Sequence, residues 1–162
     1  MVLRQRAELV LAVSATHRDR MVMALAHLQG QVPRTGGELA HADYAVIASA
    51  ELLTSRFAKL QDHLGAQLVP LALELSAEPL PSTATFMDRL LRLEKLRAVP
   101  SVVEFRRLRE LRNVLAHDYP DDPDEAVAGL HAVIAAVPAL LEIEAALRGF
   151  VEGLFERGVV GD

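Results

Sequence analysis

The stretch LRQRAELVLAVSATHRDRMVMALAHL, residues 3–28, places small and apolar residues at alternating steps of three and four. This spacing is typical of the buried stripe of a long amphipathic helix. The polar residues Ser14 and His17 lie on the same stripe, and we interpret His17 as a histidine at the edge of the core. The chain is therefore expected to begin with one long helix. Its stripe consists of Ala7, Val10, Ser14, His17, Met21, Ala24 and Leu28.

Glycine and proline residues divide the sequence that follows. Pro33 and the pair Gly36-Gly37 interrupt the first stripe, and the glycine pair is expected to form a turn. A second stripe covers residues 46–64 and ends before Gly65. Two long helices joined by a short loop predict an antiparallel hairpin. Residues 71–75 are expected to add a short helix.

Three more helices are expected in the second half of the chain. Ser82 or Thr83 is expected to cap the first of them. Pro100 is expected near the first position of the next helix, where a proline loses no intrahelical hydrogen bond. That helix should stop near residues 117–119, before a proline. The sequence DPDE, residues 122–125, then supplies an N-cap, a proline and an acid for a last helix, which should be kinked at its internal proline, residue 138.

The composition agrees with a single all-α domain over residues 1–162. Chains divide into separate cores only at about 250 to 300 residues. Aromatic residues make up 4% of the chain and tryptophan is absent, whereas leucine and alanine are abundant. This balance favours aliphatic helical stripes over a β-sandwich or barrel. We therefore predict an up-and-down bundle of four to five helices.

Composition and charge also exclude several classes of function. The lack of cysteine excludes disulfides, thiolate metal sites and thiol nucleophiles, and without a secretory signal we expect a cytoplasmic protein. A formal net charge of −5 argues against coating nucleic acid through bulk attraction, so local patches must decide. The longest nearly apolar run, residues 126–141, is shorter than the roughly 20 residues of a membrane span. We interpret it as a core helix and expect no membrane association.

The most unusual segment is EFRRLRELRNVLAHDYP, residues 104–120, with four arginines within seven positions. On a helix, Arg112 falls about 40° from Leu108, within the apolar stripe. A buried guanidinium needs a partner, which is a carboxylate, an anion or a polar group of a second subunit. The residues expected on the polar face of this helix are Arg106, Arg109, Asn113 and His117.

Two interpretations of this segment stay open from its spacing. In the first, Arg112 pairs with a carboxylate of the second helix, such as Glu51 or Asp43. His117 then caps the end of its helix, and Tyr119 packs against the turn. In the second, the segment forms a phosphate site, because arginine binds phosphate bidentately and the pKa of histidine suits proton transfer near neutral pH.

The octapeptide RNVLAHDY, residues 112–119, resembles the Arg-x4-His-x-Tyr signature of HepT-type toxins. These are HEPN ribonucleases (higher eukaryotes and prokaryotes nucleotide-binding) that are encoded beside a minimal nucleotidyltransferase antitoxin. The segment SRFAKLQDHLG, residues 55–65, also resembles the second-helix segment of HEPN-like proteins of this size. The order of the helices and the position of the motif agree as well, so the resemblance covers most of the chain.

The resemblance implies a homodimer with the HEPN fold, in which two motif helices meet across a twofold axis and cleave RNA without a metal or other cofactor. Arg112 would hold the phosphate and stabilise the charge that develops on it, and His117 would help to deprotonate the ribose 2′-hydroxyl. Asn113 would orient the scissile group or the histidine. Tyr119 would accept AMP from the nucleotidyltransferase antitoxin, which would block RNA.

The helical spacing adds conditions to this implied site. Positions 112 and 117 are separated by about 140° on a continuous helix, so one subunit alone would not aim both side chains at one phosphate. Either the helix unwinds near His117 or two subunits share the site. Arg106, Arg107 and Arg109 would attract the RNA backbone, or they form an ordinary solvated face paired with Glu104 and Glu110. The histidines have no metal-ligand spacing, so we expect no metal site.

Two other functions use the same residues. The first is a non-catalytic nucleotide-binding or substrate-presenting subunit of a nucleotidyltransferase, which does not require His117 for RNA cleavage. The second is a plain helical dimerisation protein, in which Arg112 and His117 are structural. His117→Ala would then lower stability and have no other consequence.

Overall fold

The computed structural model describes residues 2–77, 80–117 and 122–158, with the backbone alone at positions 116 and 117. Within these ranges the chain is helical and has no strand, so the predicted all-α class is confirmed. If α3, η1 and α4 are counted as one helix, these ranges contain six helices, one more than the upper number expected. The elements are α1 (Val2–Leu28), α2 (Gly36–Ala40), α3 (Tyr44–His63), the π-helical segment η1 (Leu64–Leu68), α4 (Val69–Leu75), α5 (Phe86–Lys95), α6 (Val102–His117) and α7 (Pro123–Glu156).

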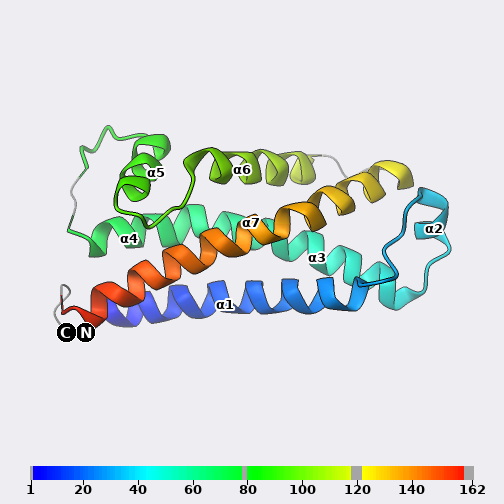
Figure 1. Cartoon of the computed structure of the whole chain (residues 1–162), viewed down its shortest axis with the longest axis horizontal. Coiled ribbons are helices and arrows are strands. Elements are labelled where there is room, and N and C mark those ends of the chain that lie inside the picture. The colour runs from blue at the N-terminus through cyan, green and yellow to red at the C-terminus, as the bar shows by residue number, and fades with distance from the viewer. Residues whose placement is uncertain (1, 78–79, 118–121, 159–162) are drawn as a thin grey trace.

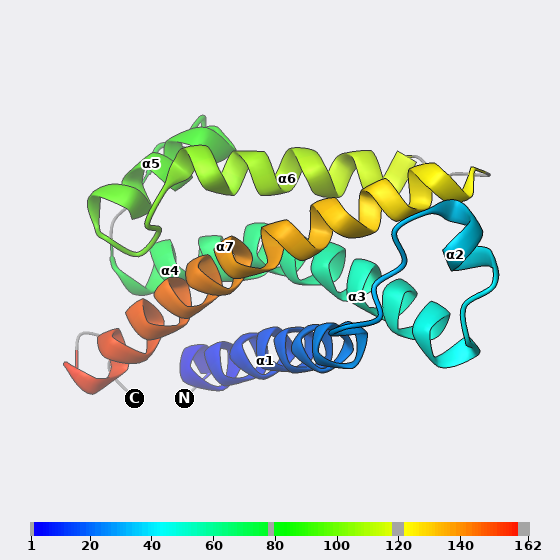
Figure 2. The ribbon, with the colours of Figure 1, turned by 45° about the vertical axis from the view of Figure 1, so that its right-hand side comes forward.

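Long helices run along the length of the molecule, and α7 crosses diagonally over the others (Figure 1). α1 packs mainly against α3, which gives the expected helical hairpin. α7 contacts α1, α2, α3, α4 and α6. The last helix of the chain therefore packs against the first helix and against helices from the middle of the sequence. In Figure 2, α6 and α1 lie on opposite sides of α7. The arginine-rich helix α6 therefore forms one outer side of the bundle.

The second long helix does not stop before Gly65, as the sequence predicted, but continues through η1 into α4. In η1 the N–H of Val69 donates to the carbonyl of Leu64, five residues earlier. This wider turn accommodates Pro70, which has no N–H to donate to an α-helical ladder. A Cβ at position 65 would lie 3.5 Å from Cζ of Phe86, an ordinary van der Waals distance, so Gly65 faces α5 at a position that has room for a Cβ.

Two helices begin later than the sequence predicted. α5 is capped by Thr85 instead of Ser82 or Thr83, because Asp88 completes a capping box with it. The N–H of Asp88 donates to Oγ1 of Thr85 at 3.1 Å, and the N–H of Thr85 donates to Oδ2 of Asp88 at 2.8 Å. A threonine followed three residues later by an acid satisfies two backbone donors, which neither earlier residue does here.

The start of α6 also differs, whereas the start of α7 is as predicted. Pro100 precedes α6, and Oγ of Ser101 accepts the N–H of Glu104 at 3.1 Å. In α7 the side chain of Asp122 accepts the N–H of Asp124 at 2.9 Å, and a proline occupies the first position. α7 then continues through Pro138 as one helix.

The glycine pair predicted as a turn instead opens the short helix α2. The N–H of Gly36 donates to Oδ1 of Asp124 at 2.5 Å, which ties α2 to the start of α7. A Cβ on Gly36 would lie 2.7 Å from the backbone nitrogen of Asp124. Only glycine therefore permits this approach. Nε2 of His131 donates to the carbonyl of Pro33 at 2.9 Å and fixes the same loop to α7.

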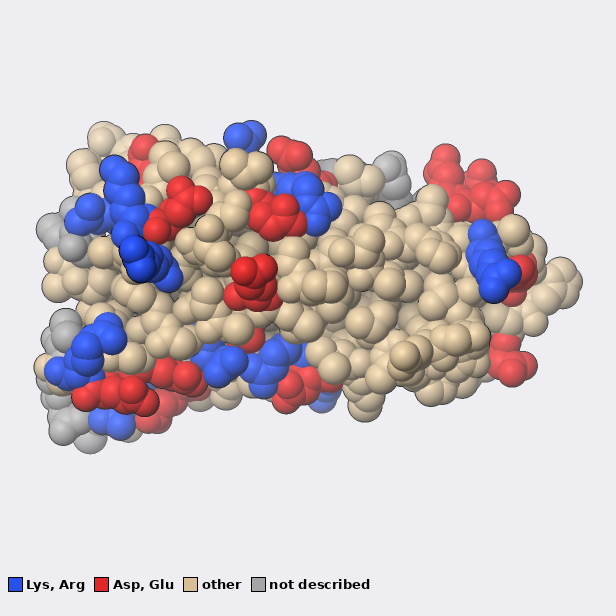
Figure 3. Space-filling model, viewed as in Figure 1, with Lys and Arg blue, Asp and Glu red and all other residues tan. Residues whose placement is uncertain are grey.

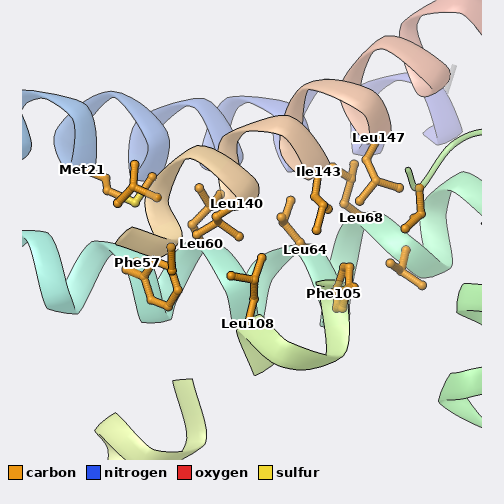
Figure 4. Close-up of a cluster of buried hydrophobic side chains, with 14 of the residues drawn as sticks. Met21, Phe57, Leu60, Leu64, Leu68, Phe105, Leu108, Leu140, Ile143 and Leu147 are labelled. Atoms are coloured by element: carbon orange, nitrogen blue, oxygen red, sulfur yellow. The ribbon is translucent and has the colours of Figure 1, made fainter. Parts of the chain in front are cut away.

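The core is formed by aliphatic side chains and two phenylalanines where α3, η1, α6 and α7 meet (Figure 4). Phe105 and Leu108 of α6 are almost fully buried in it. Each such side chain contributes roughly 1.5–3 kcal/mol on burial. These two residues therefore hold α6 against α3 and α7. The buried side chains labelled in the close-up are Met21, Phe57, Leu60, Leu64, Leu68, Phe105, Leu108, Leu140, Ile143 and Leu147.

A buried carboxylate joins α1 and α7. Glu144 is only 1% exposed, and its Oε1 accepts the hydroxyl of Ser14 and Nη1 of Arg18, both at 3.4 Å. Nε of Arg148 lies 3.4 Å from the same oxygen, close enough for an ion pair but without hydrogen-bond geometry. Ser14, which the sequence placed on the apolar stripe, is fully buried and bonded to this carboxylate.

α7 is the one helix in the described residues that is long and apolar enough to cross a membrane by length and composition. The core helix of a soluble protein passes the same test. Eleven residues of α7 are buried among the other helices. α7 is thus a core helix of this bundle, as the sequence predicted, and its length alone says nothing more about membranes.

Candidate functional site

The buried residues of α6 position Arg112 at the contact with α3. Leu108, one turn earlier, is anchored in the core, and Leu111 and Leu115 are partly buried against it. The side chain of Arg112 is 29% exposed. Its stem thus lies on the inner side of α6, while the guanidinium reaches the surface between α6 and α3.

The carboxylate that meets Arg112 is Asp62, near the end of α3. Nη2 of Arg112 donates to Oδ2 of Asp62. Asp62 is 49% exposed, so this ion pair is open to water. The partners proposed from the sequence were wrong: in the described residues, neither Glu51 nor Asp43 contacts Arg112. Asp43 precedes the first turn of α3, far along the helix from Asp62.

The remaining nitrogens of Arg112 have different surroundings. Nη1 donates to Oδ1 of Asn113 at 3.1 Å. Nε is buried and has no hydrogen-bond partner in the part of the chain that the structure describes. Asn113 itself is exposed. The structure therefore brings Asn113 onto the arginine. Asp62 and Asn113 hold the guanidinium at its two Nη atoms, while Nε stays buried and unsatisfied.

The other two residues of the motif are His117 and Tyr119. His117 is the last residue of α6, where the backbone is described and the side chain is not. Tyr119 lies outside the described residues. The α6 backbone stays helical through position 117, so it does not unwind before the histidine. Positions 112 and 117 are consequently about 140° apart around the helix axis.

The other arginines of α6 have partners of their own. Nη2 of Arg107 donates to Oε1 of Glu104 at 2.5 Å, and this bond lowers the pKa of the Glu104 carboxyl. Nη2 of Arg106 lies 3.8 Å from Oε1 of Glu110. Both pairs follow the solvated-face interpretation. The guanidinium of Arg109 instead lies 4.5 Å from the centre of the Phe86 ring, a cation–π contact with α5 that the sequence did not indicate.

The surface charge is mixed in sign. On the face shown in Figure 3, positive and negative side chains gather in the same groups, and a broad uncharged area separates them. This face therefore has no wide basic surface, in agreement with the net charge of −5. No group of three or more His, Asp or Glu side chains in the described ranges could hold a metal ion. Any binding of an anion must depend on a few arginines and lysines.

In comparisons with protein-family models, curated proteins and solved structures, nothing matches this chain. Within its described residues the chain is an all-α helical bundle. The site is defined by its own geometry: a partly buried arginine on α6, held between an aspartate of α3 and the next asparagine. The sequence signal for Asp62 was present, because this residue lies within the segment 55–65 already singled out.

Proposed function

We propose that this protein is a metal-independent endoribonuclease with the HEPN fold, the cytoplasmic toxin of a pair whose antitoxin is a nucleotidyltransferase. The observation that carries the proposal is the state of Arg112. Its guanidinium sits at the surface in an exchangeable ion pair with Asp62, inside the sequence Arg-x4-His-x-Tyr. A planar guanidinium in an ion pair that is open to water suits bidentate binding of a phosphate through its two Nη atoms.

The chemistry follows from these groups. A phosphate of RNA would replace Asp62 at Nη2, and Arg112 would stabilise the negative charge that builds on its oxygens. His117 would take the proton of the adjacent 2′-hydroxyl, and the ribose oxygen would attack phosphorus. The bond from phosphorus to the 5′-oxygen would break, which leaves a 2′,3′-cyclic phosphate, and the 5′-oxygen would take up a proton from water. Asn113, bonded to the guanidinium, would set its orientation.

Two subunits would share the site. The helical backbone separates positions 112 and 117, so a homodimer is needed to bring an arginine and a histidine to one phosphate. Arg106 and Arg109 would lie beside the cleft and attract the RNA backbone, and Tyr119 would accept AMP from the antitoxin.

The test is cleavage of a mixed RNA pool by the purified protein in excess EDTA. We expect cleavage by the parent and a loss of at least about 100-fold in Arg112→Ala, because removal of one charge-stabilising donor costs roughly that much. Arg107→Ala is the matched control, since Arg107 is an exposed arginine of the same helix that pairs with Glu104. Circular dichroism and thermal unfolding establish that each variant is folded.

Intact RNA after incubation with the folded parent would overturn the nuclease. The alternative, a non-catalytic partner of a nucleotidyltransferase, would then be tested by incubation with that enzyme and ATP. Mass spectrometry would show whether AMP is attached to Tyr119.

A further inference from the structure

A second group of positive side chains lies between α1 and α3. It consists of Arg20 on α1 and of Arg56 and Lys59 on α3, whose charges all act on the ring of His17; we call it the α1–α3 basic cluster. Nη1 of Arg56 donates to Nδ1 of His17 at 3.0 Å. The two histidine rings lie edge to face, 6.1 Å apart. Residues of two helices thus converge on one place.

None of the three cations of the α1–α3 basic cluster has a carboxylate partner in the described ranges. Other arginines of the bundle, such as Arg6, Arg107 and Arg112, form ion pairs with acids. Like charges left close together repel one another, and this repulsion needs a counter-charge to relieve it. The cluster is therefore a local positive site on a chain whose net charge is −5.

Arg56 is the member with the least satisfied surroundings. Its Nε is buried and has no hydrogen-bond partner among the described residues. Its one partner, His17, accepts the bond and must be neutral at Nδ1 to do so. A partly buried guanidinium paired only with a neutral ring is costly unless an anion approaches it.

The two histidines differ in what they leave for such an anion, because only His17 keeps a free ring donor. Nε2 of His63 donates to the carbonyl of Val10 at 2.8 Å, which orients that ring against α1. Burial first, and then the charges of Arg56, His63, Lys59 and Arg20, lower the pKa of His17. A neutral His17 that accepts at Nδ1 carries its proton on Nε2, so it remains a hydrogen-bond donor there.

We propose that the α1–α3 basic cluster binds a phosphate group of the RNA backbone, next to the phosphate that Arg112 would hold. This inference rests in part on the proposed function, which supplies RNA as the substrate. α3 connects the two places: Lys59 and Asp62 are neighbours on one helix face, and Asp62 holds Arg112. Arg56 and Asp62 are six residues apart, about 9 Å along the helix axis and about 120° around it, and Lys59 lies midway between them.

The cluster would bind the strand and take no part in the bond-breaking step. A substrate phosphate held by Arg56 and Lys59 would fix the register of the strand, so that another phosphate reaches Arg112. Loss of the cluster should therefore raise KM for RNA more than it lowers kcat. This difference separates the cluster from Arg112, whose loss should lower kcat.

Binding can be measured without cleavage by using a fluorescein-labelled 2′-O-methyl RNA oligonucleotide, which lacks the attacking hydroxyl. The double variant Arg56→Gln/Lys59→Gln is compared by fluorescence anisotropy with Arg34→Gln/Lys95→Gln. The control removes one arginine and one lysine, both exposed and without ion pairs in the described residues. Both variants thus change the net charge equally.

We expect the cluster variant to bind the oligonucleotide about tenfold more weakly than the control at low salt. The slope of log affinity against log salt should fall by about 0.7, the value for one phosphate contact on a single strand. Equal affinities and slopes for the two variants would overturn the proposal. If the double variant does not fold, Lys59→Glu against Lys95→Glu gives the same comparison, because both lysines are exposed.

The two proposals can fail separately. Weak binding by the cluster variant together with uncleaved RNA in the parent would keep the phosphate site and remove the nuclease. Cleavage that depends on Arg112, with normal binding by the cluster variant, would keep the nuclease and remove the phosphate site.

Discussion

Two arginine–carboxylate contacts of this molecule have the same chemistry and different surroundings. Glu144 is 1% exposed and joins α1 to α7 through Ser14 and Arg18. Asp62 is 49% exposed and joins α3 to α6 through Arg112 alone. A buried carboxylate has lost its hydration, so its partners must compensate for the cost of burying the charge. An exposed ion pair contributes only about 0–1 kcal/mol to the free energy of unfolding. The first contact is structural, and the second is free to exchange its anion.

The largest effect on stability is expected at the buried contact. Glu144→Ala should lower the free energy of unfolding by about 3 kcal/mol, because it leaves Arg18 and the buried hydroxyl of Ser14 without their acceptor. Urea denaturation at neutral pH would measure the change. A loss below about 1 kcal/mol would remove the distinction between the two contacts.

Loss of the exposed contact should change stability little and, at Arg112, RNA cleavage strongly. Arg112→Ala and Asp62→Ala should each change the free energy of unfolding by no more than about 1 kcal/mol, since both groups reach solvent. RNA cleavage should nevertheless be lost in Arg112→Ala and retained in Asp62→Ala. The same urea titrations, run beside cleavage assays in EDTA, give both quantities. If Arg112→Ala is as unstable as Glu144→Ala, then Arg112 is a structural residue.

The coupling between Asp62 and Arg112 provides a finer measure. In a double-mutant cycle of unfolding free energies, we expect a coupling energy of roughly 0.2–1 kcal/mol that decreases with added salt. A coupling well above this range, or one unaffected by salt, would mean that the pair does not open to a competing phosphate.

The smallest effect concerns His17, where an arginine meets a neutral ring instead of a carboxylate. Its pKa is lowered below 6.5 in the folded protein, chiefly by burial and then by Arg56. Below that value the unfolded chain binds more protons than the folded one, so stability falls as the pH drops through this window. His17→Gln should flatten this part of the stability curve. The measurement is the urea midpoint of unfolding between pH 5 and pH 7 for both proteins. If the midpoint changes with pH equally in the parent and in His17→Gln, then His17 does not titrate in this way.

The helices themselves could be predicted because their signals are local. Spacings of three and four residues gave α1 and α3, and the DPDE sequence gave the start of α7 through its cap and proline. The misplaced starts of α5 and α6 have the same origin. Ser82, Thr83 and Thr85 stand before α5, and Asp88 decides among them by completing a capping box with Thr85. Before α6 the cap is Ser101, one residue after the proline from which the start was predicted.

The partner of Arg112 could not be predicted because it depends on how α3 lies against α6. Stripe periodicity shows which side of each helix is buried and contains no information about the sliding of one helix along another. Glu51 and Asp62 are eleven residues apart, and only the packing of Phe105 and Leu108 selects Asp62. The α1–α3 basic cluster was missed for the same reason, since Arg56 and His17 are 39 residues apart in sequence.

Exchange of subunits tests most directly whether Arg112 and His117 act together across two subunits, as we propose. Arg112→Ala and His117→Ala, each inactive alone, are mixed under conditions that exchange subunits, and RNA cleavage is measured in EDTA. We predict recovery to roughly a quarter of the parent rate, because random exchange makes about half of the dimers mixed and each of these holds one intact site of two. No recovery, with exchange verified by native mass spectrometry, would contradict the shared site.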